Sequence, residues 1–223
     1  MNIEPVAYLH GDFGELFGIP RQSGLCDEII SEIVFERKYQ NPDYIRGIEQ
    51  FSHLYLLWQF SENLRDKVSA TVRPPRLGGN KRIGVFASRS PFRPNAIGLS
   101  IVRLLKIRHS ADKGEILVVS GADLLDGTPI YDIKPYIPVF DSVPGANGGY
   151  TDITYNHRLE IHYADGIEQI IPINIKALAE QILSQDVRPG YQSDPLREYG
   201  IKIRNYNIKF RVEGNVLTVT TFS

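Results

Sequence analysis

The 223-residue sequence has a single cysteine, Cys26, so the chain cannot form an internal disulfide bond. This scarcity fits a reducing compartment, and we expect Cys26 to be a structural or weakly exposed thiol. No apolar run approaches the roughly 20 residues of a membrane-spanning helix, and Leu54 to Trp58 is among the longest. The N-terminal segment carries Glu4 and no basic stretch, unlike a secretory signal. We therefore expect a cytoplasmic protein that does not contact a membrane.

The short motifs of the common cofactor sites are also missing. No Walker loop is present, and Gly78, Gly79 and Gly84 follow a Pro-Pro segment that cannot be the central strand of a dinucleotide fold. The five histidines form no pair at metal-binding spacing, so we expect no metal. His53 is interpreted as a hydrogen-bonded histidine of the core or its rim. No Gly-x-Ser-x-Gly elbow supports a hydrolase triad.

Short apolar segments separated by Gly and Pro dominate the first two-thirds of the chain. This pattern favours a β-barrel or sandwich over an alternating βαβ sheet. His53–Phe60 is nearly continuous in apolar and aromatic residues, which is typical of a strand buried on both faces or of a buried helix. Pro42 predicts a single helical turn within 41–50. The other predicted strands are 6–10, 28–36, 82–88, 97–107 and 115–120.

A change of pattern at Ser142–Thr151, which is rich in Gly and Pro, predicts a domain boundary. We expect one domain over residues 1–145 and a small α+β domain over 150–223. Apolar residues at helical spacing predict a helix whose buried face carries Ile175, Leu178, Ala179, Ile182 and Leu183. Two hairpins are predicted around it, one joining 158–163 to 167–171 through Asp-Gly and one joining 206–212 to 216–222. The whole chain is thus predicted to be mainly β with some α, an α+β protein.

The segment Thr71–Asn95 contains six cationic residues and no acidic residue, although the net charge of the chain is −1. Five of the six are arginines, whose planar guanidinium suits phosphate or carboxylate. Interleaved Pro and Gly residues stiffen the segment and permit close approach of a ligand. One interpretation is a site for an anion or a nucleic acid. The other is a solvated face whose arginines pair with acids elsewhere. The cationic residues are Arg73, Arg76, Lys81, Arg82, Arg89 and Arg93.

Three further segments carry polar groups that suit a site. Asp123 and Asp126 follow the predicted strand 115–120 and either bind a ligand or cap turns. Ile19–Leu25 offers an arginine and an amide in a loop. Asp186–Tyr191 places Arg188 and an aromatic ring beside a rigid turn, which suits either RNA contact or an ordinary surface loop.

Several blocks of this sequence resemble the signature blocks of the TsaA-like family. They are IPRQSGL (19–25), FSHLYLLWQF (51–60), TVRPPRLGGNKRIGVFASRSPFRPNAIGLS (71–100) and DLLDGTPIYDIKPYIP (123–138). The resemblance covers most of residues 5–142. DVRPGY (186–191) and YNIKFRV (206–212) resemble the C-terminal extension of members that modify tRNA.

This resemblance implies a β-barrel, an S-adenosylmethionine cofactor, a homodimer with sites near the subunit interface, and tRNA as the partner. It implies methylation of the exocyclic amine of threonylcarbamoyl-adenosine at position 37, beside the anticodon. The cofactor-site residues carried over are Pro20, Arg21, Gln22, Ser61, Glu62, Arg89, Leu99, Ser120, Gly121, Ala122, Asp123, Leu124, Leu125 and Asp126. Arg21 or Arg89 would hold the methionine carboxylate, and Asp123 or Asp126 would hold the adenosine or offset the charge of the sulfonium.

Three further points concern the proton acceptor, the alternative function and the contact with RNA. Methyl transfer from a sulfonium needs alignment of the reacting atoms at about 3–3.5 Å and no metal. The proton acceptor is not identified, with Asp126, Asp132 and Tyr131 as candidates. The second hypothesis is a non-catalytic cofactor- or RNA-binding module of the same fold. The residues expected to contact RNA are Arg73, Arg76, Lys81, Arg82, Arg93, Arg188 and Tyr191, and those expected to stack on bases are Phe92, Tyr131, Tyr136 and Tyr191.

Overall fold

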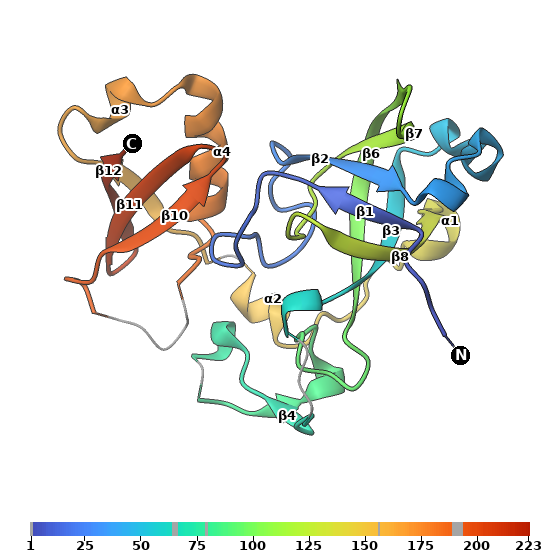
Figure 1. The fold of residues 1–223 in the computed structure, drawn as a ribbon. Coiled ribbons are helices and arrows are strands. Elements are labelled where there is room, and N and C mark those ends of the chain that lie inside the picture. The colour runs from blue at the N-terminus through green and yellow to red at the C-terminus, as the bar shows by residue number, and fades with distance from the viewer. Residues whose placement is uncertain (1, 64–66, 79, 156, 189–193) are drawn as a thin grey trace.

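The computed structural model describes residues 2–63, 67–78, 80–155, 157–188 and 194–223. A six-stranded barrel and a smaller sheet covered by helices lie side by side (Figure 1). A long loop extends from one end of the barrel (Figure 1). No helix of this described part is long and apolar enough to cross a membrane. The prediction of a mainly β protein with some helix is confirmed.

The barrel is a single antiparallel sheet whose last strand returns to the first. Its strands are ordered β1-β2-β7-β6-β3-β8, and β8 also pairs with β1, so the barrel is closed. Apolar side chains at alternate positions fill the interior, among them Leu9, Ile33, Leu56, Leu117 and Ile130. The strands are β1 Ala7–His10, β2 Ile30–Phe35, β3 His53–Gln59, β6 Ile97–Ser110, β7 Gly114–Ser120 and β8 Thr128–Pro135.

Strand β3 differs from its prediction in how it is buried, and strand β8 was not predicted at all. Because every second side chain of β3 is buried, it is an ordinary barrel strand with one buried face, not a strand buried on both faces or a helix. The sequence did not predict β8, since Pro129, Asp132 and Lys134 interrupt its apolar pattern. Its outer side chains are polar while Thr128 and Ile130 face the core.

The loop below the barrel in Figure 1 contains two very short strands, β4 Thr71–Val72 and β5 Ile83–Gly84, paired with each other. The strand predicted over 82–88 is present only as β5, because a 3₁₀ turn begins directly after Gly84 and spans Val85–Ala87. Val85 is buried and its N–H donates to the carbonyl of Ala70, which stabilises the turn. Other 3₁₀ turns are Arg37–Tyr39, Pro42–Ile45, Ile48–Gln50, Ser61–Asn63 and Pro75–Leu77. The turn at Pro42 confirms the one predicted there.

The second unit is a four-stranded sheet in the order β10-β11-β12-β9 with helix α4 (Ile173–Leu183) packed on it. All five residues predicted for the buried face of this helix are buried. The predicted hairpin through Glu213-Gly214-Asn215 is confirmed. The predicted Asp165-Gly166 hairpin is wrong, because 167–170 forms helix α3 and β9 pairs in parallel with β12. The strands are β9 Glu160–Tyr163, β10 Tyr199–Ile203, β11 Tyr206–Glu213 and β12 Val216–Phe222.

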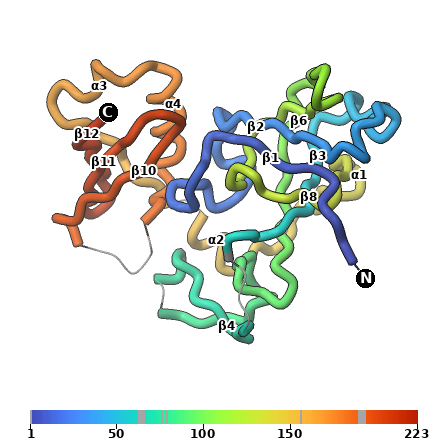
Figure 2. Tube along the Cα trace, in the orientation of Figure 1, coloured from blue at the N-terminus to red at the C-terminus, as the bar shows by residue number. Residues whose placement is uncertain are grey.

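The segment 11–29, between β1 and β2, reaches across to the second unit (Figure 2). Phe13, Cys26 and Ile29 belong to the same apolar cluster as helix α4. Burial raises the pKa of Cys26 to about 12, so the thiol is an inert packing group at neutral pH. Two short helices, α1 Pro138–Asp141 and α2 Thr151–Thr154, lie in the connection between the two units.

Candidate functional site

A cavity of about 740 Å³ opens on the outer face of the barrel, along β6 and β3. Three of the predicted cofactor residues, Arg89, Leu99 and Ser120, line it. The lining comprises Ser23, Gly24, Asp27, Ser52, His53, Tyr55, Arg89, Leu99, Ile101, Arg103, Ser120, Tyr136 and Asp141. A cavity of this volume is large enough to bury most of a small ligand.

Asp123 lies at the end of a buried hydrogen-bonded chain beside this cavity. Trp58 donates through Nε1 to Ser100 Oγ at 3.0 Å, and Ser100 donates to Asp123 Oδ1 at 2.5 Å. Since an indole N–H can only donate, Ser100 must accept from it, which directs the Ser100 proton toward the carboxylate. Burial raises the pKa of Asp123, while the Ser100 hydrogen bond and the charge of Arg89 oppose that shift.

Hydrogen bonds join the loop 19–25 to two other elements of the site. Ile101 N donates to Ser23 Oγ at 3.0 Å, and Gly24 N donates to the Gly121 carbonyl at 2.9 Å. Gly121 has φ 77°, and a Cβ at that position would lie 3.3 Å from Gly24 N, so glycine permits both the turn and the close approach. The loop is therefore fixed against β6 and against the segment 120–126.

Arg89, which lines the cavity, contacts Gln22 although 67 residues separate them. Arg89 Nη1 donates to Gln22 Oε1 at 2.5 Å. The structure thus brings together Gln22, Arg89, Leu99, Ser120 and Asp123 from four different segments. Ala122 and Leu124 direct their side chains into the barrel core, so their backbone alone is available to a ligand.

Arg21 points away from this group and toward the second unit. Its Nη2 donates to the carbonyls of Asp186 at 3.0 Å and Arg188 at 2.6 Å. Arg188 in turn makes a two-pronged ion pair with Asp186, with N–O distances of 2.7 and 2.9 Å. Burial raises the pKa of Asp186, but the Arg188 guanidinium outweighs this effect and holds the pKa below its usual range. Tyr191 lies outside the described residues.

Other predicted residues lie farther out. Pro20 is buried, while Ser61 and Glu62 form a turn after β3 and are not among the residues that line the cavity. Leu125 accepts a hydrogen bond from Thr128 through its carbonyl and forms part of the turn before β8. Asp126 Oδ1 accepts from Gly11 N at 3.1 Å, so it caps a turn beside β1.

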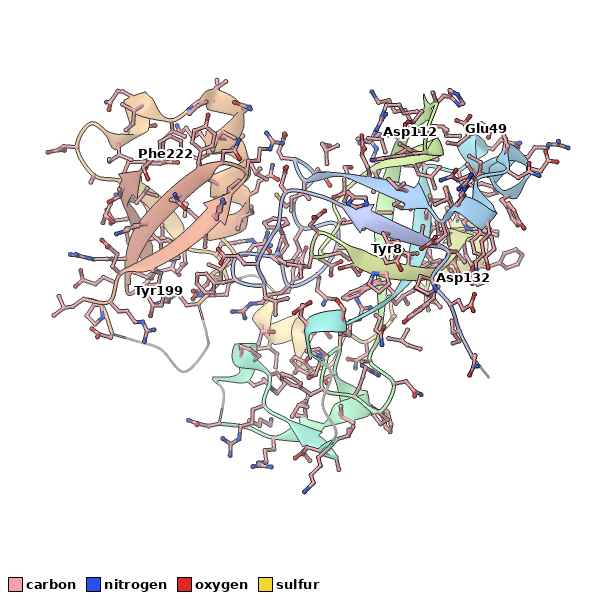
Figure 3. All side chains as sticks on the ribbon, in the orientation of Figure 1. Tyr8, Glu49, Asp112, Asp132, Tyr199 and Phe222 are labelled. Carbon is pink, nitrogen blue, oxygen red and sulfur yellow. The ribbon has the colours of Figure 1, made fainter. Side chains whose placement is uncertain are left out.

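The candidate proton acceptors lie apart from the cavity lining. Tyr131 donates to Gln59 Oε1. Asp132 forms an ion pair with Lys134 at 2.7 Å and lies on the same side of the barrel as Tyr8 (Figure 3). Neither these residues nor Asp126 are among those lining the cavity. Within the described residues, no three or more His, Cys, Asp and Glu side chains gather closely enough to hold a metal.

The cationic loop carries exposed charges that the described residues do not neutralise. Arg73, Lys81 and Arg82 are exposed, Arg82 donates to Thr71 Oγ1, and Arg93 donates to the Ser88 carbonyl. In the described part of the chain, none of these four forms an ion pair. Arg76 lies in the turn Pro75–Leu77. The interpretation of the loop as a face paired with acids elsewhere finds no support in these residues.

At one end of the cavity lies Tyr136, which was expected to stack on bases, together with Tyr55 and Arg103, which the sequence did not single out. His53 and Tyr55 on β3 stand opposite Arg103 and Ile101 on β6, and Tyr136 follows β8. The available signal was the alternation of side chains along each strand. His53 and Tyr55 are two residues apart on β3, and Leu99, Ile101 and Arg103 are spaced by two on β6. These residues can be assigned to one cavity only when the pairing of β3 with β6 is known, and the sequence does not show that pairing.

In the part of the chain that the structure describes, Arg89 and Arg103 line an open cavity, a half-buried carboxylate lies near Arg89, and four cations of the loop form no ion pair, which is the arrangement expected of a class of proteins that bind a charged small molecule and an anionic polymer. Comparison with known proteins gives this class a family. Residues 8–142 match the family model described as tRNA-methyltransferase O N-terminal domain, and 154–223 match the TrmO C-terminal domain. The chain belongs to the tRNA-methyltransferase O family, which confirms the resemblance found in its sequence.

Similarity to members of the family extends over nearly the whole chain. The tRNA (adenine(37)-N6)-methyltransferase of Escherichia coli K12 is 36% identical, with 94% of this chain and 92% of that protein covered. The enzyme of the same description from Eikenella corrodens is 43% identical over 73% of this chain and 92% of its own. A crystal structure of TrmO superimposes with a TM-score of 0.78 at 29% identity, covering 100% of this chain and 99% of that one.

Proposed function

We propose that this protein is an S-adenosylmethionine-dependent tRNA methyltransferase that modifies the exocyclic amine of threonylcarbamoyl-adenosine at position 37. The observation that carries the proposal is the match of both parts of the chain to one methyltransferase family. The cavity that joins Arg89, Leu99 and Ser120 in that family's N-terminal domain supports it. A non-catalytic binding module is not favoured, since relatives are described as S-adenosylmethionine-dependent methyltransferases.

The residues around the cavity suit this cofactor chemically. Asp123 is a half-buried carboxylate near an arginine, which suits either ribose hydroxyls or the positive sulfonium. Arg89 lines the cavity and offers the donors of its guanidinium to a carboxylate. We assign the methionine carboxylate to Arg89 and not to Arg21, because Arg21 donates to the carbonyls of the second unit.

Catalysis in this proposal rests on alignment. When bound, S-adenosylmethionine supplies a methyl group on a sulfur that is already an activated leaving group. The protein has to hold the acceptor nitrogen in line and about 3–3.5 Å from that methyl group. The Ser23–Ile101 and Gly24–Gly121 hydrogen bonds fix the loop 19–25, which would help to keep the bound cofactor aligned. The role of Asp126, Tyr131 and Asp132 as proton acceptors finds no support from their positions.

We also propose a separate role for each of the two parts of the chain. Residues 1–145 would form the cofactor-binding catalytic domain and 150–223 a domain that contacts tRNA. The unpaired cations of the loop would meet phosphates of the RNA. Arg188 would act mainly by holding the backbone around Asp186, since its guanidinium is paired with that carboxylate. Because tRNA is its substrate, the enzyme would work in the cytoplasm.

A homodimer formed through the outer face of β6 completes the proposal. Ile97, Leu99 and Ile101 expose apolar side chains there, and Val139 and Phe140 of helix α1 are exposed as well. Exposed apolar side chains gathered on one element mark an interaction surface. Since Leu99 and Ile101 also line the cavity, such a dimer would place the cofactor site beside the subunit interface.

The test is to incubate the protein with radiolabelled S-adenosylmethionine and tRNA from cells that lack this methyl group. Label on the threonylcarbamoyl-adenosine at position 37 is expected, found by digestion and chromatography. Cofactor binding in calorimetry without transfer of label would instead identify the non-catalytic module.

A further inference from the structure

The cavity continues beyond the residues assigned to the cofactor. On β6 the outward positions Leu99, Ile101 and Arg103 follow one another along its floor. Four residues of strand span about 13 Å, so Arg103 lies roughly that far from Leu99 along the strand. Arg103 itself, at this end of the cavity, has no assigned ligand, although it stands opposite Ser120 in the pairing of β6 with β7 and is therefore adjacent to a residue assigned to the cofactor.

Aromatic rings form the wall of this end. Tyr136 makes an edge contact with His53 at 6.4 Å between ring centroids and a tilted contact with Tyr55 at 5.6 Å. Ser52 Oγ lies 2.9 Å from His53 Nδ1, which fixes that ring. Tyr136 is anchored as well, because its N–H donates to the His53 carbonyl at 2.9 Å. The rings form a preorganised surface on which a planar base can stack.

Arg103 is exposed, and in the described part of the chain it has neither an ion pair nor a hydrogen bond through its side chain. Arg108 on the same strand differs, because it pairs with Glu32 at 2.7 Å. Two carboxylates, Asp27 and Asp141, also line the cavity. Asp141 Oδ2 accepts from Ile137 N at 2.6 Å, which holds it within its own helix. The N–H donors of the Arg103 guanidinium are therefore available to a ligand.

We propose that this end of the cavity binds the modified base of the substrate, with the free carboxylate of its threonyl group on Arg103 and its ring against Tyr136. The inference rests on the proposed function and adds the substrate subsite to it. The methyl acceptor must lie in contact with the cofactor, and this end shares one cavity with the Arg89–Leu99 end. A planar guanidinium binds carboxylate with two parallel hydrogen bonds, whereas an unmodified adenine offers no such partner.

The experiment compares two synthetic anticodon stem-loop RNAs. One carries threonylcarbamoyl-adenosine at position 37, and the other carries the methyl ester of its carboxylate. Methyl transfer and RNA binding are measured for the wild type, Arg103→Gln and Arg108→Gln, the last as a matched control on the same strand. Cofactor affinity by calorimetry and thermal unfolding show whether each variant is intact.

The wild type is expected to prefer the free acid. Loss of one charge-assisted contact should lower kcat/KM and binding for the free acid about 10- to 100-fold in Arg103→Gln, with little change for the ester. Arg108→Gln should keep the preference. Equal losses on both RNAs, an unchanged preference, or a weakened cofactor affinity in Arg103→Gln would overturn the proposal.

The aromatic wall provides a second readout. Tyr136→Leu should weaken binding of both RNAs by about 5- to 100-fold, since base stacking on an aromatic ring contributes roughly 1–3 kcal/mol. Tyr136→Phe should keep wild-type binding, and equal binding by the leucine variant would remove Tyr136 from the subsite. If the wild type transfers no methyl group to either RNA, the proposed function fails, while the subsite is still decided by the binding preference.

Discussion

Replacing Ser100 with alanine would remove the central link between Trp58 and Asp123. Ser100 is only 1% exposed, so water cannot easily take the place of the lost hydroxyl. The substitution deletes the 2.5 Å hydrogen bond to the carboxylate and leaves the Trp58 N–H without its acceptor. Both changes raise the free energy of keeping Asp123 ionised at the proposed cofactor site.

The magnitude follows from the type of hydrogen bond. A bond to a charged group contributes about 1.5–3 kcal/mol, or roughly 10- to 100-fold in an equilibrium constant. Burial already raises the pKa of Asp123 and Ser100 lowers it, so removing Ser100 raises the pKa further. The ionised form is then lost at a higher pH than in the wild type. Cofactor affinity should fall most at acidic pH and approach the wild-type value as the pH is raised.

The assay is calorimetric titration with S-adenosylmethionine between pH 5 and 8. Ser31→Ala is the matched control, because Ser31 is also a buried serine of a barrel strand but belongs to β2. The acidic limb of the affinity profile should move toward higher pH in Ser100→Ala and stay in place in Ser31→Ala. Profiles that coincide for Ser100→Ala and the wild type would refute the reasoning.

Three other substitutions test separate parts of the structure. Arg89→Ala should weaken S-adenosylmethionine binding at least tenfold in calorimetry, and wild-type affinity would remove it from the site. Gly98→Ala should lower the free energy of unfolding by about 1–3 kcal/mol in denaturant titration, because its Cβ would lie 2.3 Å from Trp58. Arg82→Gln should weaken tRNA binding and reduce the salt slope by about one while sparing cofactor affinity; an unchanged slope would exclude a phosphate contact.

Local patterns in the sequence predicted the elements whose partners lie nearby. Helix α4 was predicted with its buried face, because five apolar residues at helical spacing need only one surface to cover them. The β11–β12 hairpin was predicted from its turn. Strand β8 was missed because Pro129, Asp132 and Lys134 interrupt its apolar pattern and because the sequence does not show its pairing with the distant β1 and β3. The parallel pairing of β9 with β12 was missed for the same reason.

The candidate site could be predicted only in part for a related reason. The composition of the cationic loop and the family resemblance indicated which segments matter. They could not indicate that Gln22 meets Arg89, or that Trp58 and Ser100 support Asp123, because these contacts depend on how the barrel strands pair. The outward register of β3 and β6 likewise determines that His53 and Arg103 face one cavity.

The position of Phe13, Cys26 and Ile29 in the apolar cluster around helix α4 has a consequence for how the protein can be divided. A chain ending near residue 145 would expose these three side chains to water, and its loop 19–25 would lose the hydrogen bond that the Leu25 carbonyl accepts from Gln185. The two halves therefore cannot be exchanged freely between relatives. A transplanted C-terminal half needs a matching loop from the barrel to complete its own interior.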